Sequence, residues 1–154
     1  LSIRRQRQMC KETVCKYGYD NKKIFNAFPS NLYNVEPIVA IDDIPPNIRK
    51  RTIENICKSV NPDILIGDFN TDKFVEPIRH YKRKYLVNPM LPFDPLPHIR
   101  DYDRENTIGL FGWEERNLQW IYSHHYPKSI IFSFYEAMIL SDIAKMITAI
   151  HPTI

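Results

Sequence analysis

Asn61-Pro62-Asp63-Ile64-Leu65-Ile66-Gly67-Asp68-Phe69-Asn70 is the stretch that decides the predicted fold of this chain. Its short apolar run predicts a buried strand, and Asp68 and Asn70 project to the same side at the strand's end. An Asp can orient an attacking water and an Asn can hold a phosphoryl oxygen beside a hydrated Mg²⁺, so the pair suits phosphate chemistry. A surface β-turn is the alternative, because Gly, Asp and Asn dominate turns for conformational reasons.

The segments around this strand predict a layered α/β (or α+β) domain, with a mixed β-sheet and flanking helices. A β-branched run, 38–41, predicts a strand, and a helix capped by Asn47 is expected to continue to Val60. Strand, helix and strand within about 30 residues is the size of a βαβ unit. The other elements expected are helices over 6–16 and 71–85, a long loop over 87–104, strands over 118–123 and 129–134, and a helix or a turn with a short strand over 135–150.

Composition indicates one folded domain over residues 1–154, which can be a piece of a longer protein. The chain is 44% hydrophobic and 25% charged, which argues against extensive disorder. It has no apolar stretch near 18 residues, so no membrane span is expected. Three cysteines leave at least one unpaired in a monomer, which favours a reducing, intracellular compartment such as the cytoplasm or nucleus.

A basic cluster interleaved with aromatic residues follows the opening strand. Basic side chains can neutralise phosphates while aromatic rings stack on bases, the combination that single-strand binders use. The formal net charge of +3 permits such a polyanionic partner. A solvated helix face is the alternative for this cluster. The candidate nucleic-acid-binding residues are Arg79, Tyr81, Lys82, Arg83 and Lys84.

Read in order, several segments resemble the endonuclease/exonuclease/phosphatase superfamily, which includes DNase I-like enzymes, abasic-site endonucleases and retrotransposon endonucleases. The stretch 63–71 is similar to the family's signature strand. In the family this Asp orients or activates the nucleophile and this Asn contacts the phosphate, so the resemblance implies catalytic roles for Asp68 and Asn70. The implied fold is a trimmed, DNase I-like sandwich.

Two shorter matches imply ligands for Mg²⁺. Cys10-Lys11-Glu12-Thr13 resembles a Gln-Glu-Thr motif whose carboxylate binds the metal, which implies Glu12 as a ligand. Leu140-Ser141-Asp142-Ile143 resembles the family's terminal Ser-Asp-His and makes Asp142 a second metal candidate. If Glu12, Asp68 and Asp142 converge they make a Mg²⁺ site, and if they scatter each is an ordinary surface acid.

Two departures from the family pattern bear on activity. The segment 116–123 resembles a family strand in which Gln119 stands where an Asp is expected. Ile143 replaces the terminal histidine, and the loss of a positioned acid/base group typically costs ~10²–10⁴ in rate. His124 and His125 are alternative acid/base candidates, or belong to a polar turn before Pro127.

Three functions are therefore open. We favour a degenerate relative that acts as a nucleic-acid-binding or protein-assembly module. The first alternative is an active Mg²⁺-dependent phosphodiesterase on DNA or RNA. The second is a structural subunit unrelated to nucleases.

Overall fold

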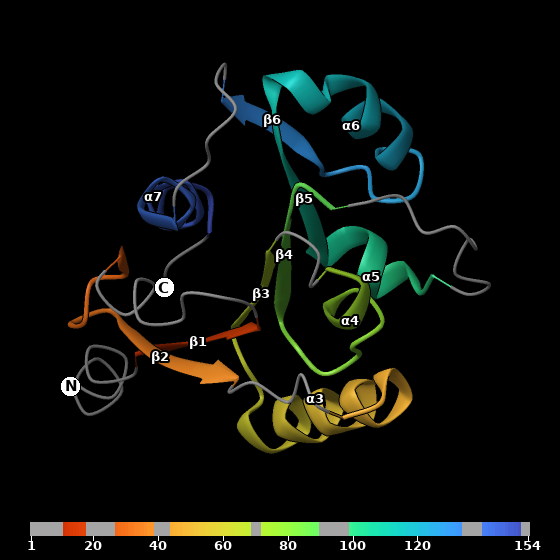
Figure 1. Ribbon diagram of the computed structural model, residues 1–154. Helices are drawn as coiled ribbons and strands as arrows, with labels where there is room; N and C mark the ends of the chain where they lie inside the picture. The colour runs from red at the N-terminus through yellow and green to blue at the C-terminus, as the bar shows by residue number, and fades with distance from the viewer. Residues whose placement is uncertain are drawn as a thin grey trace.

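The computed structural model describes residues 11–17, 27–38, 44–68, 72–89, 99–133 and 140–151, and the structural statements below concern these residues. Six strands form one sheet in the order β2-β1-β3-β4-β5-β6 (Figure 1). The strands are β1 (Glu12–Tyr17), β2 (Tyr33–Ile38), β3 (Ile64–Asp68), β4 (Arg83–Val87), β5 (Thr107–Gly112) and β6 (Ile130–Ser133).

Every pairing between neighbouring strands is parallel. This confirms the α/β class and corrects the mixed sheet that was expected. Parallel neighbours need crossover connections, and the connections from β2 to β3, β3 to β4, β4 to β5 and β5 to β6 carry helices. The trimmed DNase I-like sandwich is not confirmed, because the described residues form a single sheet with helices on its two faces.

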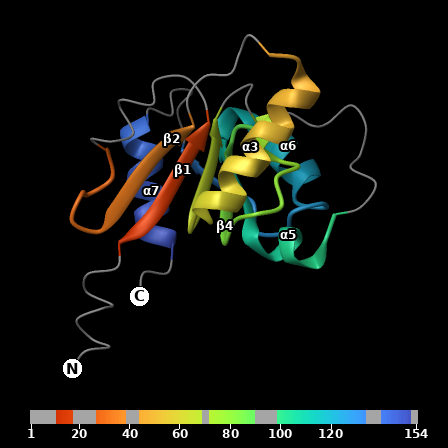
Figure 2. The same ribbon diagram turned by 90° about the horizontal axis from the view of Figure 1, so that it is seen from below.

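The helices divide unequally between the two faces of the sheet (Figures 1 and 2). One face is covered by the helices that follow β2, β3, β4 and β5, and the opposite face by the last helix. The helices are α3 (Pro46–Val60), α4 (Asp72–Val75), α5 (Asp101–Asn106), α6 (Arg116–Tyr122), which follows the 3-10 turn η2 (Trp113–Glu115), and α7 (Leu140–Ile150).

The opening strand lies at the centre of two hydrophobic cores. Ile64 and Ile66 are buried in the cluster that contains residues of α7, whereas Leu65 is buried in the cluster that contains residues of α3. A strand covered on both faces reads as a continuous apolar run, and this explains why three successive apolar residues form β3.

The predicted βαβ unit is confirmed with shifted boundaries. β2 ends at Ile38, and residues 39–43 lie outside the described part of the chain. α3 begins at Pro46, a residue suited to the first helical position because its missing N–H has no partner there. Asn47 therefore lies inside the first turn and not at the N-cap. The helix ends before Asn61, which is left-handed with φ 52°.

Three other predicted elements are wrong. The described part of 6–16 is strand β1, not a helix, and it is buried between β2 and β3. The segment 118–123 belongs to α6, because Leu118 and Tyr122, four positions apart, face the core together. The segment 71–85 holds only the short α4 and the start of β4, with Pro77 between them.

The remaining expectations fit in part. β6 matches the strand expected over 129–134, and α7 matches the helical alternative for the last segment, whose residues 134–139 lie outside the description. The expected long loop contains α5 at its carboxyl end, and its residues 90–98 also lie outside the described part.

Candidate functional site

Asp68 is the last residue of β3 and lies at the point where the sheet changes direction. The chain passes from β1 outward to β2, returns across β1 to β3, and then continues in the opposite direction through β6. Ligands of open α/β sheets bind outside the carboxyl ends of the strands at such a switch point, here between β1 and β3. The topology therefore places the predicted catalytic Asp at the preferred ligand position. The Asp68 side chain and Asn70 lie outside the described part.

Gly67, which precedes this Asp, has a packing role of its own. A Cβ built on Gly67 would lie 2.8 Å from Cβ of Val75 and 3.0 Å from its Cγ2. α4 therefore approaches β3 so closely that only a residue without a side chain fits. The glycine of the opening motif is explained by helix–strand packing and needs no ligand.

Glu12, the first residue of β1, lies at the other end of the sheet. Tyr17 pairs with Gly67 in the parallel register, so Asp68 lies level with the position after β1, six residues from Glu12. At about 3.3 Å per residue the two positions are roughly 20 Å apart. Glu12 and Asp68 are therefore too far apart to share one metal ion, and for this pair the alternative of separated acids holds.

Glu12 is instead part of a buried polar chain. Its Oε2 lies 2.5 Å from Nε2 of His151, and Nδ1 of the same ring lies 3.3 Å from the hydroxyl of Tyr85. The chain joins the start of β1, the residue after α7 and the middle of β4. Burial raises the pKa of Tyr85 to about 12, so its phenol stays protonated at neutral pH. No sequence signal identified this set, because its members are far apart along the chain.

Asp142 lies in the first turn of α7. β6 ends at the carboxyl edge of the sheet, while α7 ends at His151 beside Glu12 on the amino edge. Eleven helical residues span about 16 Å, so α7 runs back across the sheet and begins toward the carboxyl edge. Asp142 and Asp68 are thus on the same side of the molecule, although the side chain of Asp142 is not described.

Of the three implied Mg²⁺ ligands, only the side chain of Glu12 is among the described ones. The described residues contain no group of three or more His, Cys, Asp or Glu side chains that could hold a metal ion. Ile143, at the place of the family's histidine, is fully buried under the sheet. Gln119, at the place of an Asp, donates from Nε2 to the carbonyl of Ser129 at 2.9 Å and holds α6 against the turn before β6.

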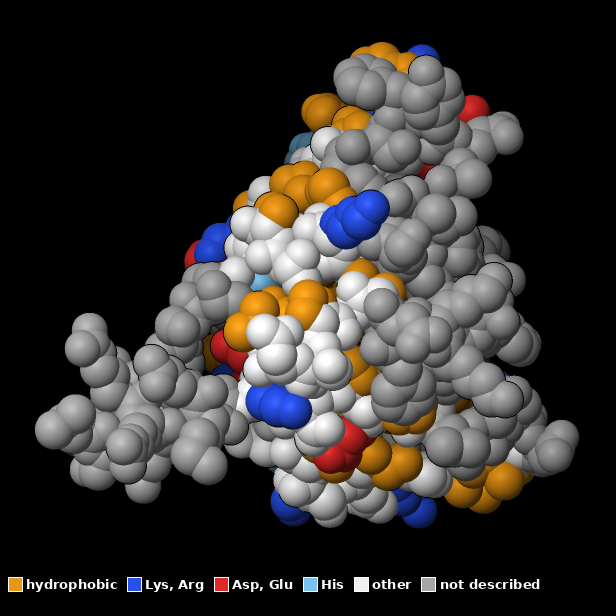
Figure 3. Space-filling view, turned by 90° about the vertical axis from the view of Figure 1, so that its left-hand side faces the viewer, with side chains coloured by type: hydrophobic (Ala, Val, Ile, Leu, Met, Phe, Trp, Pro, Cys, Tyr) orange, Lys and Arg blue, Asp and Glu red, His pale blue; other side chains and the backbone are white. Residues whose placement is uncertain are grey.

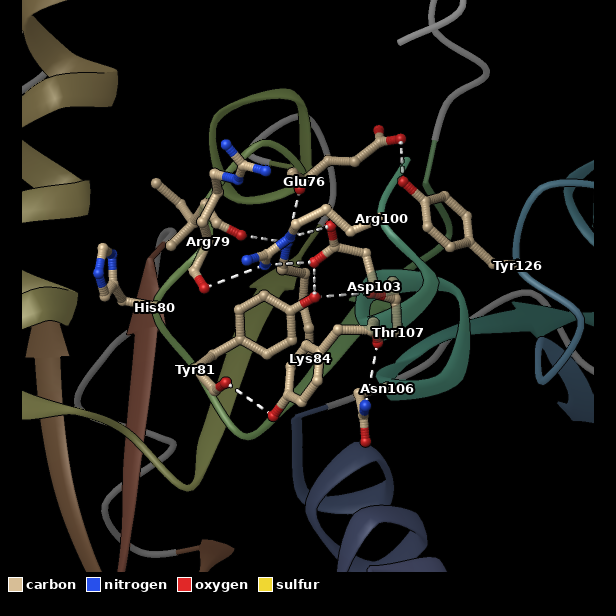
Figure 4. Close-up of polar contacts among 12 residues, drawn as sticks. Glu76, Arg79, His80, Tyr81, Lys84, Arg100, Asp103, Asn106, Thr107 and Tyr126 are labelled. Atoms are coloured by element: carbon tan, nitrogen blue, oxygen red, sulfur yellow. Dashed lines mark hydrogen bonds and ion pairs between the residues drawn. The ribbon is translucent and has the colours of Figure 1, made fainter. Parts of the chain in front are cut away.

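The predicted basic cluster is split between core and surface. Lys84 is only 1% exposed, and its Nζ donates to the carbonyls of Glu76 (2.5 Å) and Ile78 (2.8 Å), beyond the end of α4 (Figure 4). Burial lowers the pKa of Lys84 to about 7. The ammonium also lies 4.3 Å from the ring centroid of Tyr81, which is itself buried. Lys84 and Tyr81 are therefore internal residues, and their assignment to a nucleic-acid surface is corrected.

A second layer of polar contacts closes this internal site. The hydroxyl of Tyr81 donates to Asp103, whose two oxygens accept from Nε and Nη2 of Arg100 at 2.7 and 2.8 Å (Figure 4). Arg100 also donates to the carbonyl of Arg79 at 3.1 Å. The hydrogen bonds from Arg100 and Tyr81 lower the pKa of Asp103 although burial opposes them. The network links α5 to the segment before β4 and reads as structural, because each group already has a protein partner.

The other three predicted residues lie nearer the surface. Arg79 is exposed, and its backbone N–H donates to Oε2 of Glu54 in α3 at 2.9 Å. Lys82 is exposed and pairs with Asp63 at 2.8 Å, and Arg83 is half-buried. Glu54 thus joins the segment of Arg79 to the outer side of α3.

α3 carries a basic outer surface. The α3 side chains Lys50, Arg51 and Lys58 are exposed, and none has an ion pair within the described residues. The only acid of the helix, Glu54, already accepts from Arg79 and contacts the ring of His80. We call Lys50, Arg51, Lys58 and Arg79 the basic face. Among the described side chains in view on the side covered by α7, those of Lys and Arg lie apart from one another (Figure 3).

A second surface feature lies along η2 and α6. Trp113 is 43% exposed and Trp120 is 66% exposed. The guanidinium of Arg116 lies 5.0 Å from the ring centroid of Trp113, and His124 packs edge-on against Trp120 at 4.7 Å. We call these four residues the aromatic stripe. The structure thus places both tryptophans of the chain at the surface.

Neither a protein-family model, nor a curated protein, nor a solved structure matches this chain. Within the described part, no helix has both the length and the apolar character needed to cross a membrane.

Proposed function

We propose that this chain is a nucleic-acid-binding domain that uses the basic face and hydrolyses no phosphodiester. The observation that carries the proposal is the set of three exposed α3 cations without an ion pair in the described chain, next to Arg79 from a separate segment. Lys50 and Lys58 are eight positions apart, about 12 Å along the helix axis. Charges spread over this length suit a polymer of phosphates better than one small anion.

The proposed lack of hydrolysis is supported by the separation of the acids. Glu12, the implied metal ligand, is roughly 20 Å from Asp68 by strand register, and its carboxylate is bound to His151. Ile143 is a core residue, so α7 offers no acid/base group at that position. The parallel sheet lends no support to the resemblance with the endonuclease/exonuclease/phosphatase superfamily. The proposal therefore depends on the basic face and not on that ancestry.

The proposal includes a reducing, intracellular location. Cys15 and Cys57 support it, because both are free thiols buried between β1 and α3. If no nucleic acid binds, that result would point to a protein as the partner instead.

Binding is tested by fluorescence anisotropy with labelled single-stranded RNA and DNA and the matching duplexes, in chelator, over a salt series. Each phosphate contact with a single strand contributes about −0.7 to the slope of log K against log [salt]. Four contacts from the basic face predict a slope near −3. Arg51→Gln/Lys58→Gln should make the slope shallower by about 1.4 and weaken binding at low salt.

The matched control is Lys145→Glu, which changes the charge by the same two units on α7, at the opposite face. It should leave the slope nearly unchanged. Absence of binding at low salt, or equal effects of the two variants, would refute the basic face as the binding surface.

One observation favours the alternative of an active phosphodiesterase: the place of Asp68 at the switch point between β1 and β3. In that alternative Asp68 directs the water, Asn70 holds the phosphate and Asp142 contributes to Mg²⁺ binding. Incubation of DNA and RNA with Mg²⁺ or Mn²⁺ should give no cleavage under our proposal. Metal-dependent cleavage that Asp68→Ala abolishes would establish the alternative.

A further inference from the structure

We propose that the aromatic stripe, Trp113, Arg116, Trp120 and His124, is a stacking platform for unpaired bases. This inference rests on the proposed function and adds to it: the nucleic acid is single-stranded, and the protein holds bases as well as phosphates. The combination of cations and aromatic rings expected between residues 79 and 85 is absent from that surface, because Tyr81 and Tyr85 are buried. It occurs instead on α6.

The geometry of the stripe follows from helical spacing. Its members are three, four and four positions apart, so they lie on the same side of η2, α6 and the turn that follows. Leu118 and Tyr122 of the same helix face the core, which turns the stripe outward. Trp113 and Trp120 are about 11 Å apart along the axis, a spacing that leaves room for more than one base.

Each indole is held in place by a neighbour. Arg116 lies over Trp113 and donates from Nη1 to the carbonyl of the same residue at 3.2 Å. Nδ1 of His124 donates to the carbonyl of Trp120 at 2.9 Å while its ring contacts the indole. An indole whose orientation is fixed before binding loses less freedom when a base stacks on it. The Arg116 cation is also available to a phosphate or to a second base.

The stripe and the basic face belong to the same side of the molecule. α3 and α6 both pack on the sheet face that carries Leu65 and Phe111, and Figure 2 shows both helices on the side away from α7. They are separated by two to four strand spacings, roughly 10–20 Å. A single strand of a few nucleotides can span this distance, with phosphates on α3 and bases on α6.

The test uses the two tryptophans themselves, because the chain contains no others. Emission excited at the long-wavelength edge, where indole absorbs and tyrosine does not, therefore reports on the stripe alone. A single-stranded oligonucleotide should quench this emission as it binds, and the variants Trp113→Phe and Trp120→Phe assign the quenching to each position. Stacking is worth about 1–3 kcal/mol per base, so Trp120→Ala should weaken single-strand binding by roughly 5- to 150-fold, while Trp120→Phe retains most of the affinity.

The control is Ile121→Ala, which removes a neighbouring exposed apolar side chain outside the stripe and should leave affinity unchanged. Trp120→Ala should also leave the salt slope unchanged, since it removes no charge, whereas Arg51→Gln/Lys58→Gln changes that slope. Circular dichroism confirms that each variant is folded.

The outcomes separate the two proposals. Salt-dependent binding without quenching, with wild-type affinity in Trp120→Ala, would overturn the platform and leave the basic face standing. Equal affinity for duplex and single strand would also overturn it. No binding of any nucleic acid would overturn both proposals.

Discussion

Gly67→Ala tests whether the glycine of the opening motif is there for packing or for a ligand. The new Cβ would meet three atoms of Val75 at 2.8, 3.0 and 3.2 Å, against the 3.5–4.0 Å of an ordinary carbon contact. The closest atom is the Val75 Cβ, which no side-chain rotation can move, so β3 and α4 must separate. Overpacking of this kind costs roughly 1–3 kcal/mol. The lower entropy of the unfolded alanine chain returns about 0.4–1 kcal/mol.

The midpoints of these two ranges leave a net loss in free energy of unfolding of about 1.3 kcal/mol, measured by urea denaturation. The decisive comparison is the same substitution in a chain that carries Val75→Gly, where all three contacting atoms have been removed. There Gly67→Ala should be neutral or slightly stabilising. An equal cost in both backgrounds, or no cost in the wild type, would refute the packing explanation and return Gly67 to the candidate ligand site.

Three further predictions concern stability and reactivity. His151→Ala leaves the Glu12 carboxylate and the Tyr85 hydroxyl without this partner, so it should lower the free energy of unfolding by roughly 1–3 kcal/mol. Amide exchange at the end of α7 should become faster. Unchanged exchange there would contradict a link between α7 and β1 through this side chain. Burial lowers the pKa of Lys84 to about 7 from 10.5, so between these values the unfolded chain binds the proton that the folded chain has released, and the free energy of unfolding should rise with pH. Denaturant unfolding between pH 7 and 9 should show this rise, at most about 1.4 kcal/mol per pH unit, and a Lys84→Met variant with the same slope as the wild type would disprove it. Burial raises the pKa of both Cys15 and Cys57 to about 12, so neither thiol should react with a thiol reagent at pH 8 until denaturant unfolds the chain. Labelling is detected by mass spectrometry of peptides. Labelling of either thiol under native conditions would show that it is not buried.

Local sequence pattern predicted the elements with strong apolar runs or helical spacing. β3 and α3 were predicted in kind, and a helix was one of the two alternatives for α7. Ile64 to Ile66 is a continuous apolar run, and the buried residues of both helices recur at helical intervals. β1 was missed because its buried positions include Lys16, a residue that reads as a surface residue of a helix. α6 was mistaken for a strand because Trp120 and Ile121 are exposed apolar residues. They interrupt the helical spacing of Leu118 and Tyr122, the two residues that face the core.

The candidate site was predictable only where neighbours in sequence are also neighbours in space. Asp68 was placed correctly at a strand end, since that follows from the run before it. The partners of Glu12 and Lys84 could not be found, because His151 is 139 positions from Glu12 and the Lys84 contacts depend on where α4 ends. Whether a basic residue can contact a ligand or belongs to the core depends on its burial. A run of basic residues in the sequence does not show which of them are buried.

The contact between Glu12 and His151 has a consequence for how this domain can be built into a longer polypeptide. It brings the entry into the first strand and the exit from the last helix to one corner of the molecule. The part of the chain from Glu12 to His151 therefore begins and ends at the same corner, an arrangement that suits its insertion into a loop of a host protein.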